Sequence, residues 1–141
     1  MRDAVVPCAR ALLGVPFAHR GTSMNGMDCV GFVWCALRDA GAYVPEIYPY
    51  GRWAEPAGLG MHLSSYADEV ELDAVEPGDI YLMSIGDVEQ HLGIYTGDGR
   101  MIHVLELSGG NRGAVTEHDI TVPWHRRLVS AWRWKDNLWL A

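Results

Sequence analysis

Apolar residues recur at helical spacing in the first part of the chain and in short alternating runs in the second. Residues 3–13 have this helical spacing, and Gly14 follows as a stop, so we expect a helix there. Asp28 is a good N-cap for a second helix that runs to about residue 40. Apolar residues cover most of its circumference: Val30, Phe32, Val33, Trp34, Ala36 and Leu37. This second helix is therefore expected in the core.

The rest of the chain predicts strands after a long connection. Residues 43–76 show little periodicity and are expected to form a crossing loop, with a possible short helix near 58–68. Alternating runs then predict four strands, at 80–85, 92–96, 101–107 and 128–134. Helices followed by antiparallel strands indicate an α+β fold in which the helices pack on the sheet.

Composition favours a single domain over residues 1–141. The 141 residues are 49% hydrophobic and 21% charged, which suits one soluble core. The net charge of −7 argues against direct nucleic-acid binding. No signal-peptide core and no run near the ~20 apolar residues of a membrane span is present, so we expect synthesis in the cytoplasm and no membrane insertion.

One of the three cysteines stands out. None lies in a Cys-x-x-Cys pair, which disfavours a disulfide framework and a zinc ribbon. Cys8 and Cys35 lie among apolar residues and are expected to be buried. Cys29 falls at the start of the second helix, where unpaired N–H groups and the helix dipole are expected to lower the pKa of a thiol. The sequence thus predicts a primed nucleophile.

Two histidines, His91 and His103, flank a predicted hairpin, whose register decides whether they meet. A two-residue loop at 98–99 would place them on opposite faces. A three-residue loop over 97–99, with its last glycine left-handed, pairs Gly93 with His103 and places both rings on one face. Because Gly93 has no side chain, it leaves room for the rings to meet. We expect this second register.

These side chains form a plausible nucleophilic site. Cys29 would attack a carbonyl, His91 would act as base and then as acid, and His103 would fix the tautomer of His91. The backbone N–H of Cys29 would help to stabilise an oxyanion. Asp28, whose carboxylate would disfavour a thiolate, is expected to be a structural cap.

A zinc site is the chief chemical alternative, since Cys29, His91 and His103 are also a possible ligand set. No cofactor is otherwise expected. The remaining histidines share no motif with the cysteine and are expected to be solvated or in loops: His19, His62, His118 and His125.

Three blocks of the sequence, at 9–23, 26–33 and 77–104, resemble the NlpC/p60 family of cell-wall cysteine peptidases. In order and spacing they cover roughly residues 9–105. The chain looks most similar to short members that are encoded with phage tail genes and in gene transfer agents. The resemblance implies a papain-like α+β core, with Cys29 as nucleophile, His91 as base and His103 as the third polar residue.

The resemblance also implies a substrate and a setting. The substrate would be peptidoglycan stem peptides, commonly cut between γ-D-glutamyl and a diamino acid. A phage-like tail particle would carry the protein to the target cell envelope, with tail hub or tail-tip proteins as partners. A structural tail component with a retained peptidase fold, and amidase or transpeptidase chemistry, are the alternatives.

The chain departs from the family at two positions near the expected site. Phe17 stands where many members carry a tyrosine, and Val30 replaces a serine that often follows the cysteine. If the missing hydroxyl helps to bind the substrate or the oxyanion, the hydroxyl of Tyr95 or backbone groups are expected to substitute for it, or the enzyme is expected to work more slowly.

Two regions lie outside the matched blocks. The loop at 43–57 would wall the substrate cleft, although packing of Tyr48, Tyr50 and Trp53 over the sheet is the more ordinary role. The last residues, 137–141, are unusually apolar for a free tail, and we hypothesise that they dock on a tail protein.

Overall fold

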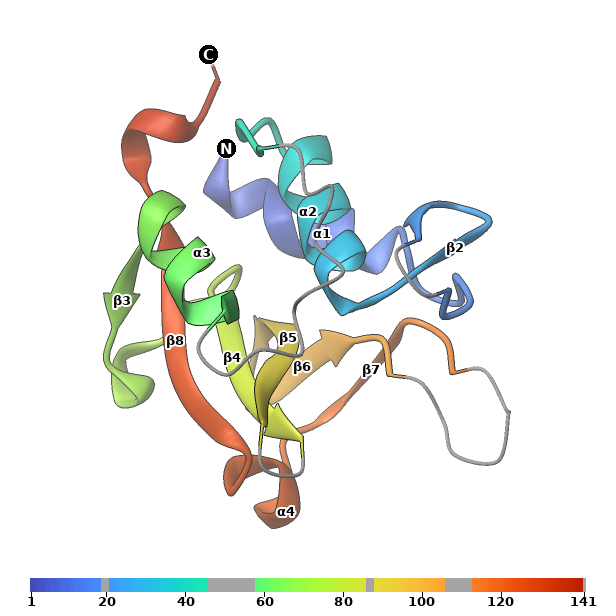
Figure 1. Ribbon diagram of the computed structural model, residues 1–141, viewed down its shortest axis with the longest axis vertical. Helices are drawn as coiled ribbons and strands as arrows, with labels where there is room; N and C mark the ends of the chain where they lie inside the picture. The colour runs from blue at the N-terminus through green and yellow to red at the C-terminus, as the bar shows by residue number, and fades with distance from the viewer. Residues whose placement is uncertain (19–20, 46–57, 86–87, 106–112, 141) are drawn as a thin grey trace.

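The computed structural model describes residues 1–18, 21–45, 58–85, 88–105 and 113–140. Helices pack on a six-stranded sheet, which confirms the α+β fold (Figure 1). In chain order the elements are η1 (Arg2–Ala4), α1 (Val5–Arg10), β1 (Thr22–Ser23), β2 (Gly26–Met27), α2 (Cys29–Asp39), α3 (Gly58–Tyr66), β3 (Ala67–Val70), η2 (Leu72–Ala74), β4 (Ile80–Ile85), β5 (Val88–Gly97), β6 (Arg100–His103), β7 (Thr116–Asp119), α4 (Val122–His125), β8 (Leu128–Trp134) and η3 (Asp136–Leu138).

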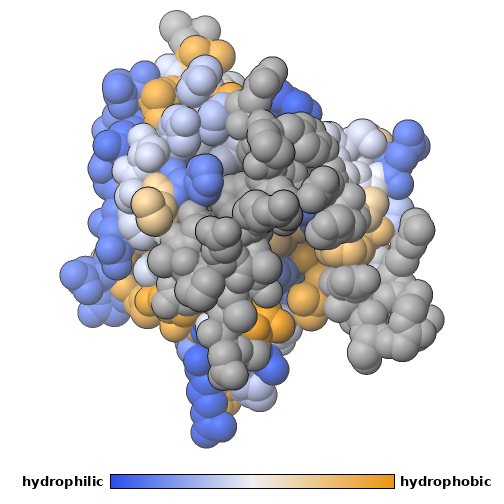
Figure 2. Space-filling model, viewed as in Figure 1, coloured by the Kyte–Doolittle hydropathy of each residue, from blue (hydrophilic) through white to orange (hydrophobic). Residues whose placement is uncertain are grey.

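The sheet has the strand order β3-β8-β4-β5-β6-β7, and every neighbouring pair is antiparallel. The chain makes the hairpins β4–β5 and β5–β6, then returns β8 between β3 and β4. The edge strand β3 exposes Asp68 and Glu69, and charges of this kind discourage pairing with another sheet. Hydrophilic residues gather accordingly on the left side of Figure 2, over β3.

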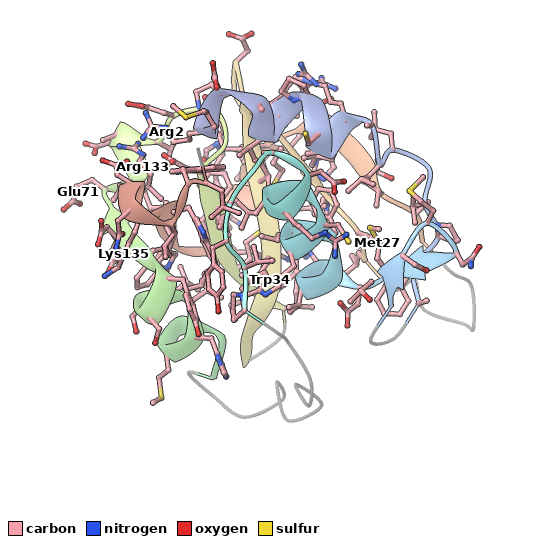
Figure 3. The ribbon with its side chains drawn as sticks, turned by 90° about the horizontal axis from the view of Figure 1, so that it is seen from above. Arg2, Met27, Trp34, Glu71, Arg133 and Lys135 are labelled. Atoms are coloured by element: carbon pink, nitrogen blue, oxygen red, sulfur yellow. The ribbon has the colours of Figure 1, made fainter. Side chains whose placement is uncertain are left out.

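Alternation along the strands divides the core between the two faces of the sheet. The helices α1 and α2 lie side by side across one face (Figure 3). They cover a large apolar cluster to which the sheet contributes Ile80, Leu82, Leu92, Ile94 and Ile102. The other face carries a smaller cluster that includes Tyr81, Met83, Met101, Ile120 and Ala131, packed against Trp124 of α4. The candidate histidines belong to this second face.

Helix α2 begins as the sequence predicts. The Asp28 carboxylate accepts a hydrogen bond from Gly31 N–H at 2.8 Å, which caps the first turn. All residues from Val30 to Leu37 are buried. Gly31 lies against the preceding loop, because a Cβ built on it would come within 2.0 Å of the Gly21 carbonyl oxygen. Cap and close packing together hold the start of α2, with Cys29, in a fixed place.

The β5–β6 hairpin has the expected register through a different turn. Ile94 pairs with Ile102, so Gly93 stands opposite His103. Asp98 and Gly99 form a two-residue turn in which both have positive φ, +54° and +70°. The predicted three-residue loop is therefore wrong, but a β-bulge between Tyr95 and Gly97 adds the residue that restores the register.

Other expectations need correction. The predicted helix over 3–13 is a 3₁₀ turn followed by α1, which ends at Arg10. The connection at 43–76 contains α3, near the possible helix at 58–68, and also β3, a strand that pairs with β8. Strand β6 ends at His103 rather than at 107. The strands predicted at 80–85 and 128–134 match β4 and β8.

The described part of the C-terminus packs on the domain itself. Leu138 and Trp139 lie against the main apolar cluster, and Tyr43 N–H donates to the Leu138 carbonyl at 2.7 Å. Leu140 N–H donates to the Gly41 carbonyl at 2.8 Å. Residues 138–140 are thus held on the domain, and the hypothesis that 137–141 dock on a tail protein stays a prediction. Removing these residues is expected to destabilise the domain.

A buried ion pair joins β8 to the turn before β4. The Asp79 carboxylate is fully buried and accepts two hydrogen bonds from Arg133, at 2.9 and 2.7 Å. Glu76 N–H donates to the same carboxylate at 2.8 Å. Arg2 reaches Glu76 from η1, and Figure 3 shows Arg2 and Arg133 on the same side of the molecule. This network fixes the start of the strand that pairs with β5.

Candidate active site

Cys29 is the first residue of α2 and reaches the middle of β5. Its side chain is half-buried against the main apolar cluster. The backbone N–H groups of Leu92 and Val30, and that of Cys29 itself, face the Cys29 sulfur and favour its thiolate form. Because Leu92 directly follows His91 on β5, the thiol lies beside the strand that carries the expected base.

The structure brings His91 and His103 into direct contact. His91 Nε2 and His103 Nδ1 are 2.7 Å apart across the β5–β6 pair, and each residue is only 4% exposed. The two rings meet edge to face. Gly93 makes this possible, since a Cβ built on it would lie 3.3 Å from the Cβ of His103. Because this contact uses Nε2 of His91, Nδ1 is the ring nitrogen of His91 that takes no part in it.

Burial keeps both histidines neutral. Loss of hydration lowers the pKa of His91 to about 4. Burial, followed by the positive charges that His91 and His118 would carry, lowers the pKa of His103 to about 3. At neutral pH each ring therefore has one N–H donor and one nitrogen lone pair. A neutral imidazole beside a thiol is suited to accept a proton.

The expectation that the thiol of Cys29 has a lowered pKa is wrong. Burial, with the neighbouring Asp28 carboxylate as the second cause, raises the pKa of Cys29 to about 12. The three backbone N–H groups act in the opposite direction, but their effect is smaller than the cost of burying a thiolate. At rest the Cys29 thiol and the rings of His91 and His103 are therefore neutral.

The geometry of the histidine pair disfavours the alternative of a zinc site. Two nitrogens bound tetrahedrally to one zinc ion lie about 3.3 Å apart, given Zn–N distances of about 2.05 Å. His91 Nε2 and His103 Nδ1 are closer, at 2.7 Å, and face each other as a donor and an acceptor. These nitrogens are placed to bond to each other.

Sequence reasoning missed a third histidine. His118 lies on β7 opposite Met101 of β6, and its Nε2 is 2.7 Å from Nε2 of His103. The expectation of a solvated or loop role for His118 is therefore wrong. Strand β7 is short and polar, so no periodicity reveals it, and only its pairing with β6 brings His118 to the site.

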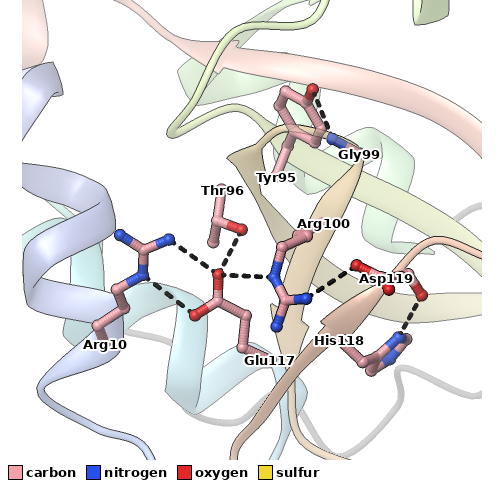
Figure 4. Close-up of polar contacts among 8 residues, drawn as sticks. All are labelled: Arg10, Tyr95, Thr96, Gly99, Arg100, Glu117, His118 and Asp119. Atoms are coloured by element: carbon pink, nitrogen blue, oxygen red, sulfur yellow. Dashed lines mark hydrogen bonds and ion pairs between the residues drawn. The ribbon is translucent and has the colours of Figure 1, made fainter.

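The positions that depart from the family pattern have structural roles here. Phe17 packs on the main apolar cluster, and Val30 is buried in it. The Tyr95 hydroxyl accepts a hydrogen bond from Gly99 N–H at the hairpin turn (Figure 4). Tyr95 is four residues beyond His91 along β5, about 13 Å. The expected substitution of this hydroxyl at the site is therefore wrong, and the other two expectations, backbone groups or slower catalysis, stay predictions.

The opposite face of β7 is anchored by Glu117 (Figure 4). Its carboxylate accepts two hydrogen bonds from Arg10 of α1, at 3.1 and 2.9 Å, and one from the Thr96 hydroxyl at 2.8 Å. The hydrogen bond from Arg10 is the main cause that lowers the pKa of Glu117 to about 2. These contacts tie β7, with His118, to α1 and to the bulge in β5.

Several expectations fall outside the described residues. They concern His19 and the aromatic residues of the loop at 46–57, Tyr48, Tyr50 and Trp53. His62 and His125 are described and exposed. Within the described ranges, no helix is long and apolar enough to cross a membrane.

The chain has a cysteine at the start of a helix, and this helix packs on an antiparallel sheet that carries two histidines in contact. These features place it in the class of α+β domains with a cysteine–histidine site. The comparisons make this specific: the model of the NlpC/P60 family matches residues 14–133, and the chain belongs to this family.

Relatives are 28–32% identical to this chain over the aligned residues. A probable endopeptidase of Mycobacterium tuberculosis is 32% identical over 102 residues, which are 72% of this chain and 23% of the relative. Tail tip assembly protein K of Escherichia phage lambda is 30% identical over 131 residues, 89% of this chain and 60% of that protein. Murein DD-endopeptidase MepS/Murein LD-carboxypeptidase of Escherichia coli is 28% identical over 101 residues, 68% of this chain and 45% of the relative. The chain thus spans less than two thirds of each.

Solved structures confirm the fold. An NlpC/P60 family protein from Bacillus cereus superposes with a TM-score of 0.72 at 23% identity, over 95% of this chain and 40% of that one. RipD of Mycobacterium tuberculosis, described as a non-catalytic NlpC/p60 domain protein, gives 0.61 at 20% identity, over 93% and 94%. At these identities the likeness concerns the fold alone.

Proposed function

We propose that this domain is a cysteine endopeptidase that hydrolyses the stem peptides of peptidoglycan. The observation that carries the proposal is the 2.7 Å contact between His91 Nε2 and His103 Nδ1. His91 lies on β5 next to Leu92, whose backbone N–H faces the Cys29 sulfur. The relatives named as endopeptidases support the substrate class. The bond expected to be cut joins γ-D-glutamyl to a diamino acid.

The geometry suits acyl transfer through a thioester. As the Cys29 sulfur attacks the carbonyl carbon, its proton passes to Nδ1 of His91, and the resulting imidazolium donates from Nε2 to Nδ1 of His103. Backbone N–H groups at the start of α2 stabilise the tetrahedral oxyanion. The intermediate collapses to a thioester as His91 returns its proton to the leaving amine. Water then attacks the thioester with His91 as base, which releases the acid and restores the thiol.

The test is mass spectrometry of the fragments that purified sacculi release. Wild-type protein under reducing conditions is expected to release stem-peptide fragments whose masses name the bond. Cys29→Ala is expected to release none, and His91→Gln to lose at least about 10³-fold in rate, as removal of a base requires. Cys35→Ala is the matched control, because Cys35 is buried on the same helix and its thiol donates to the Thr22 carbonyl. Release of the same fragments by Cys29→Ala would refute the proposal.

We also propose a setting for this activity. The similarity to tail tip assembly protein K supports a component of a phage-like tail that opens the wall during DNA delivery. Tail hub or tail-tip proteins are then the partners, and the tail carries the protein to the target envelope. Particles assembled with Cys29→Ala are expected to form normally and to deliver DNA poorly.

A structural role in the tail is the second candidate function, and the same similarity to protein K favours it. In that case the Cys29→Ala particles deliver DNA as well as wild type, and sacculi stay intact with both proteins. Amidase or transpeptidase chemistry is separated by product mass, because hydrolysis adds one water for each bond cut.

A further inference from the structure

Three histidines form a continuous chain that ends on a backbone carbonyl. His91 Nε2 faces His103 Nδ1 at 2.7 Å, and His103 Nε2 faces His118 Nε2 at 2.7 Å. At the far end, His118 Nδ1 lies 2.8 Å from the carbonyl oxygen of Asp119, and Figure 4 shows this last contact. Each of the three contacts requires one donor and one acceptor.

The carbonyl fixes the direction of the whole chain. A carbonyl oxygen only accepts, so His118 carries its proton on Nδ1, and its Nε2 accepts from His103 Nε2. A neutral imidazole has one N–H group, so His103 Nδ1 must then accept from His91 Nε2. The proton of His91 is thereby placed on Nε2, and its Nδ1 has a lone pair.

The His91–His103 pair alone would not achieve this order. Either ring could donate across their 2.7 Å contact, and one of the two arrangements leaves the proton of His91 on Nδ1. We infer that His118 is a positioning residue that, with the Asp119 carbonyl, holds the base His91 in the tautomer with an unprotonated Nδ1. The inference rests on the proposed function, because it takes this nitrogen as the atom that accepts the proton of Cys29.

Neighbouring groups hold His118 in place. Trp124 of α4 packs edge-on against His103, with ring centroids 4.8 Å apart, and also contacts His118 at 5.3 Å. The indole ring thus covers the junction between the two histidines. The guanidinium of Arg127 lies 4.7 Å from the centre of the Trp124 ring.

The same chain makes the base sensitive to the group that faces His103. A donor in the place of His118 Nε2 would donate to His103 instead of accepting from it. His103 in turn donates from Nδ1 to Nε2 of His91, and the proton of the neutral His91 moves to Nδ1. The base is lost although His91 gains no charge.

The charged and titratable groups around His118 are few among the described residues. His103 faces it from β6, and Arg127 approaches from beyond Trp124. The carboxylate of Asp119, on the same strand, is paired with Arg100 at 2.8 Å. No carboxylate among these groups forms a hydrogen bond with the ring of His118, so the hydrogen-bond order is set by His103 and the Asp119 carbonyl.

The direct test is the tautomer of each ring in the wild-type protein, read from the nitrogen shifts of ¹⁵N-labelled imidazoles at neutral pH. The expected result is a proton on Nε2 of His91, on Nε2 of His103 and on Nδ1 of His118. A proton on Nδ1 of His91 in the folded protein would overturn the inference. This readout needs neither substrate nor variant.

Kinetics on sacculi provide the second test. His118→Gln supplies an amide oxygen that accepts from His103 and does not titrate, so kcat/KM at neutral pH is expected within about threefold of wild type. His118→Lys supplies only donors and reverses the chain, so kcat is expected to fall on the order of 10²-fold with little change in KM.

His125→Lys is the matched control, because His125 is exposed on α4 and takes no part in the chain. Equal activity of His118→Lys and His125→Lys would overturn the inference. The expected tautomers in a protein that leaves sacculi intact would refute the proposed function and leave the tautomer order standing. Hydrolysis of sacculi by a protein with a proton on Nδ1 of His91 would refute the tautomer order and leave the proposed function standing.

Discussion

Lowering the pH from 7 to 5 is expected to destabilise the fold through His91 and His103. Burial lowers the pKa of His91 from 6.5 to about 4, so the unfolded chain binds a proton in a pH range where the folded protein does not. Stability therefore falls as the pH drops through 6.5 and continues to fall to about 4. The pKa of His103 is lowered to about 3, so its effect has the same sign.

The magnitude follows from proton linkage. Each histidine contributes a slope of up to about 1.4 kcal/mol per pH unit between its two pKa values. Between pH 7 and pH 5 this amounts to about 2 kcal/mol for each histidine, or about 4 kcal/mol for the pair. The carboxylate of Glu117, with a pKa lowered to about 2 from 4.5, loses its contribution only below pH 4.5. The histidine effect is thus separated from acid denaturation by carboxylates.

The assay is urea unfolding followed by tryptophan fluorescence at half-unit steps from pH 7 to pH 4.5. The double variant His91→Gln/His103→Gln keeps amide groups that form hydrogen bonds but do not titrate. It is expected to lose about 4 kcal/mol less than wild type between pH 7 and pH 5. His125→Gln is the control for an exposed histidine and is expected to follow wild type.

An equal loss of stability in wild type and in the double variant would refute the reasoning. It would mean that the two rings are as well hydrated in the folded protein as in the unfolded chain. The free energies of unfolding are compared only between pH values at which the m-value is the same. A change in m signals that the unfolded state itself has changed.

Three further predictions concern single residues. Because burial raises the pKa of Cys29 to about 12, iodoacetamide is expected to label this thiol slowly at pH 7. The labelling rate is expected to rise up to pH 9 without reaching a plateau. Fast labelling at pH 7 would contradict this prediction. Gly93→Ala places a Cβ 3.3 Å from the Cβ of His103, so the ring of His103 must move, and kcat on sacculi is expected to fall about tenfold. An unchanged kcat would show that the His91–His103 contact tolerates this movement. Arg133→Ala leaves the fully buried carboxylate of Asp79 without its cation, so the free energy of unfolding in urea is expected to fall by about 3–5 kcal/mol. A fall of less than about 1 kcal/mol would show that the pair contributes only as a surface salt bridge does.

The place of Cys29 at a helix start and the contact between His91 and His103 were predictable from local signals. Asp28 precedes an apolar run and caps α2, which places Cys29 at the helix start. The two-residue alternation of strands, with Gly93 opposite His103, brings two histidines that are 12 positions apart into contact. Both signals lie within a few residues of the groups they place.

The parts that the sequence did not predict depend on tertiary structure. His118 lies on a polar strand that forms only because β6 offers an edge and Glu117 is held by Arg10. The direction of the shift in the pKa of Cys29 depends on how much of the domain covers the thiol, which helix position alone does not reveal. The β-bulge that corrects the hairpin register likewise has no signature in the loop residues.

The raised pKa of Cys29 and the lowered pKa of His91 together constrain the order of events in the proposed reaction. With values of about 12 and about 4, the two groups differ by roughly eight pKa units. Moving the proton before attack would then cost roughly 11 kcal/mol if the two ions did not attract each other. A turnover of about 10 s⁻¹ allows a total barrier of about 16 kcal/mol, so a separate ion-pair step would consume most of it. The proton is therefore expected to leave the sulfur as the carbon–sulfur bond forms, when negative charge passes to the oxyanion and the N–H groups at the start of α2 can bind it.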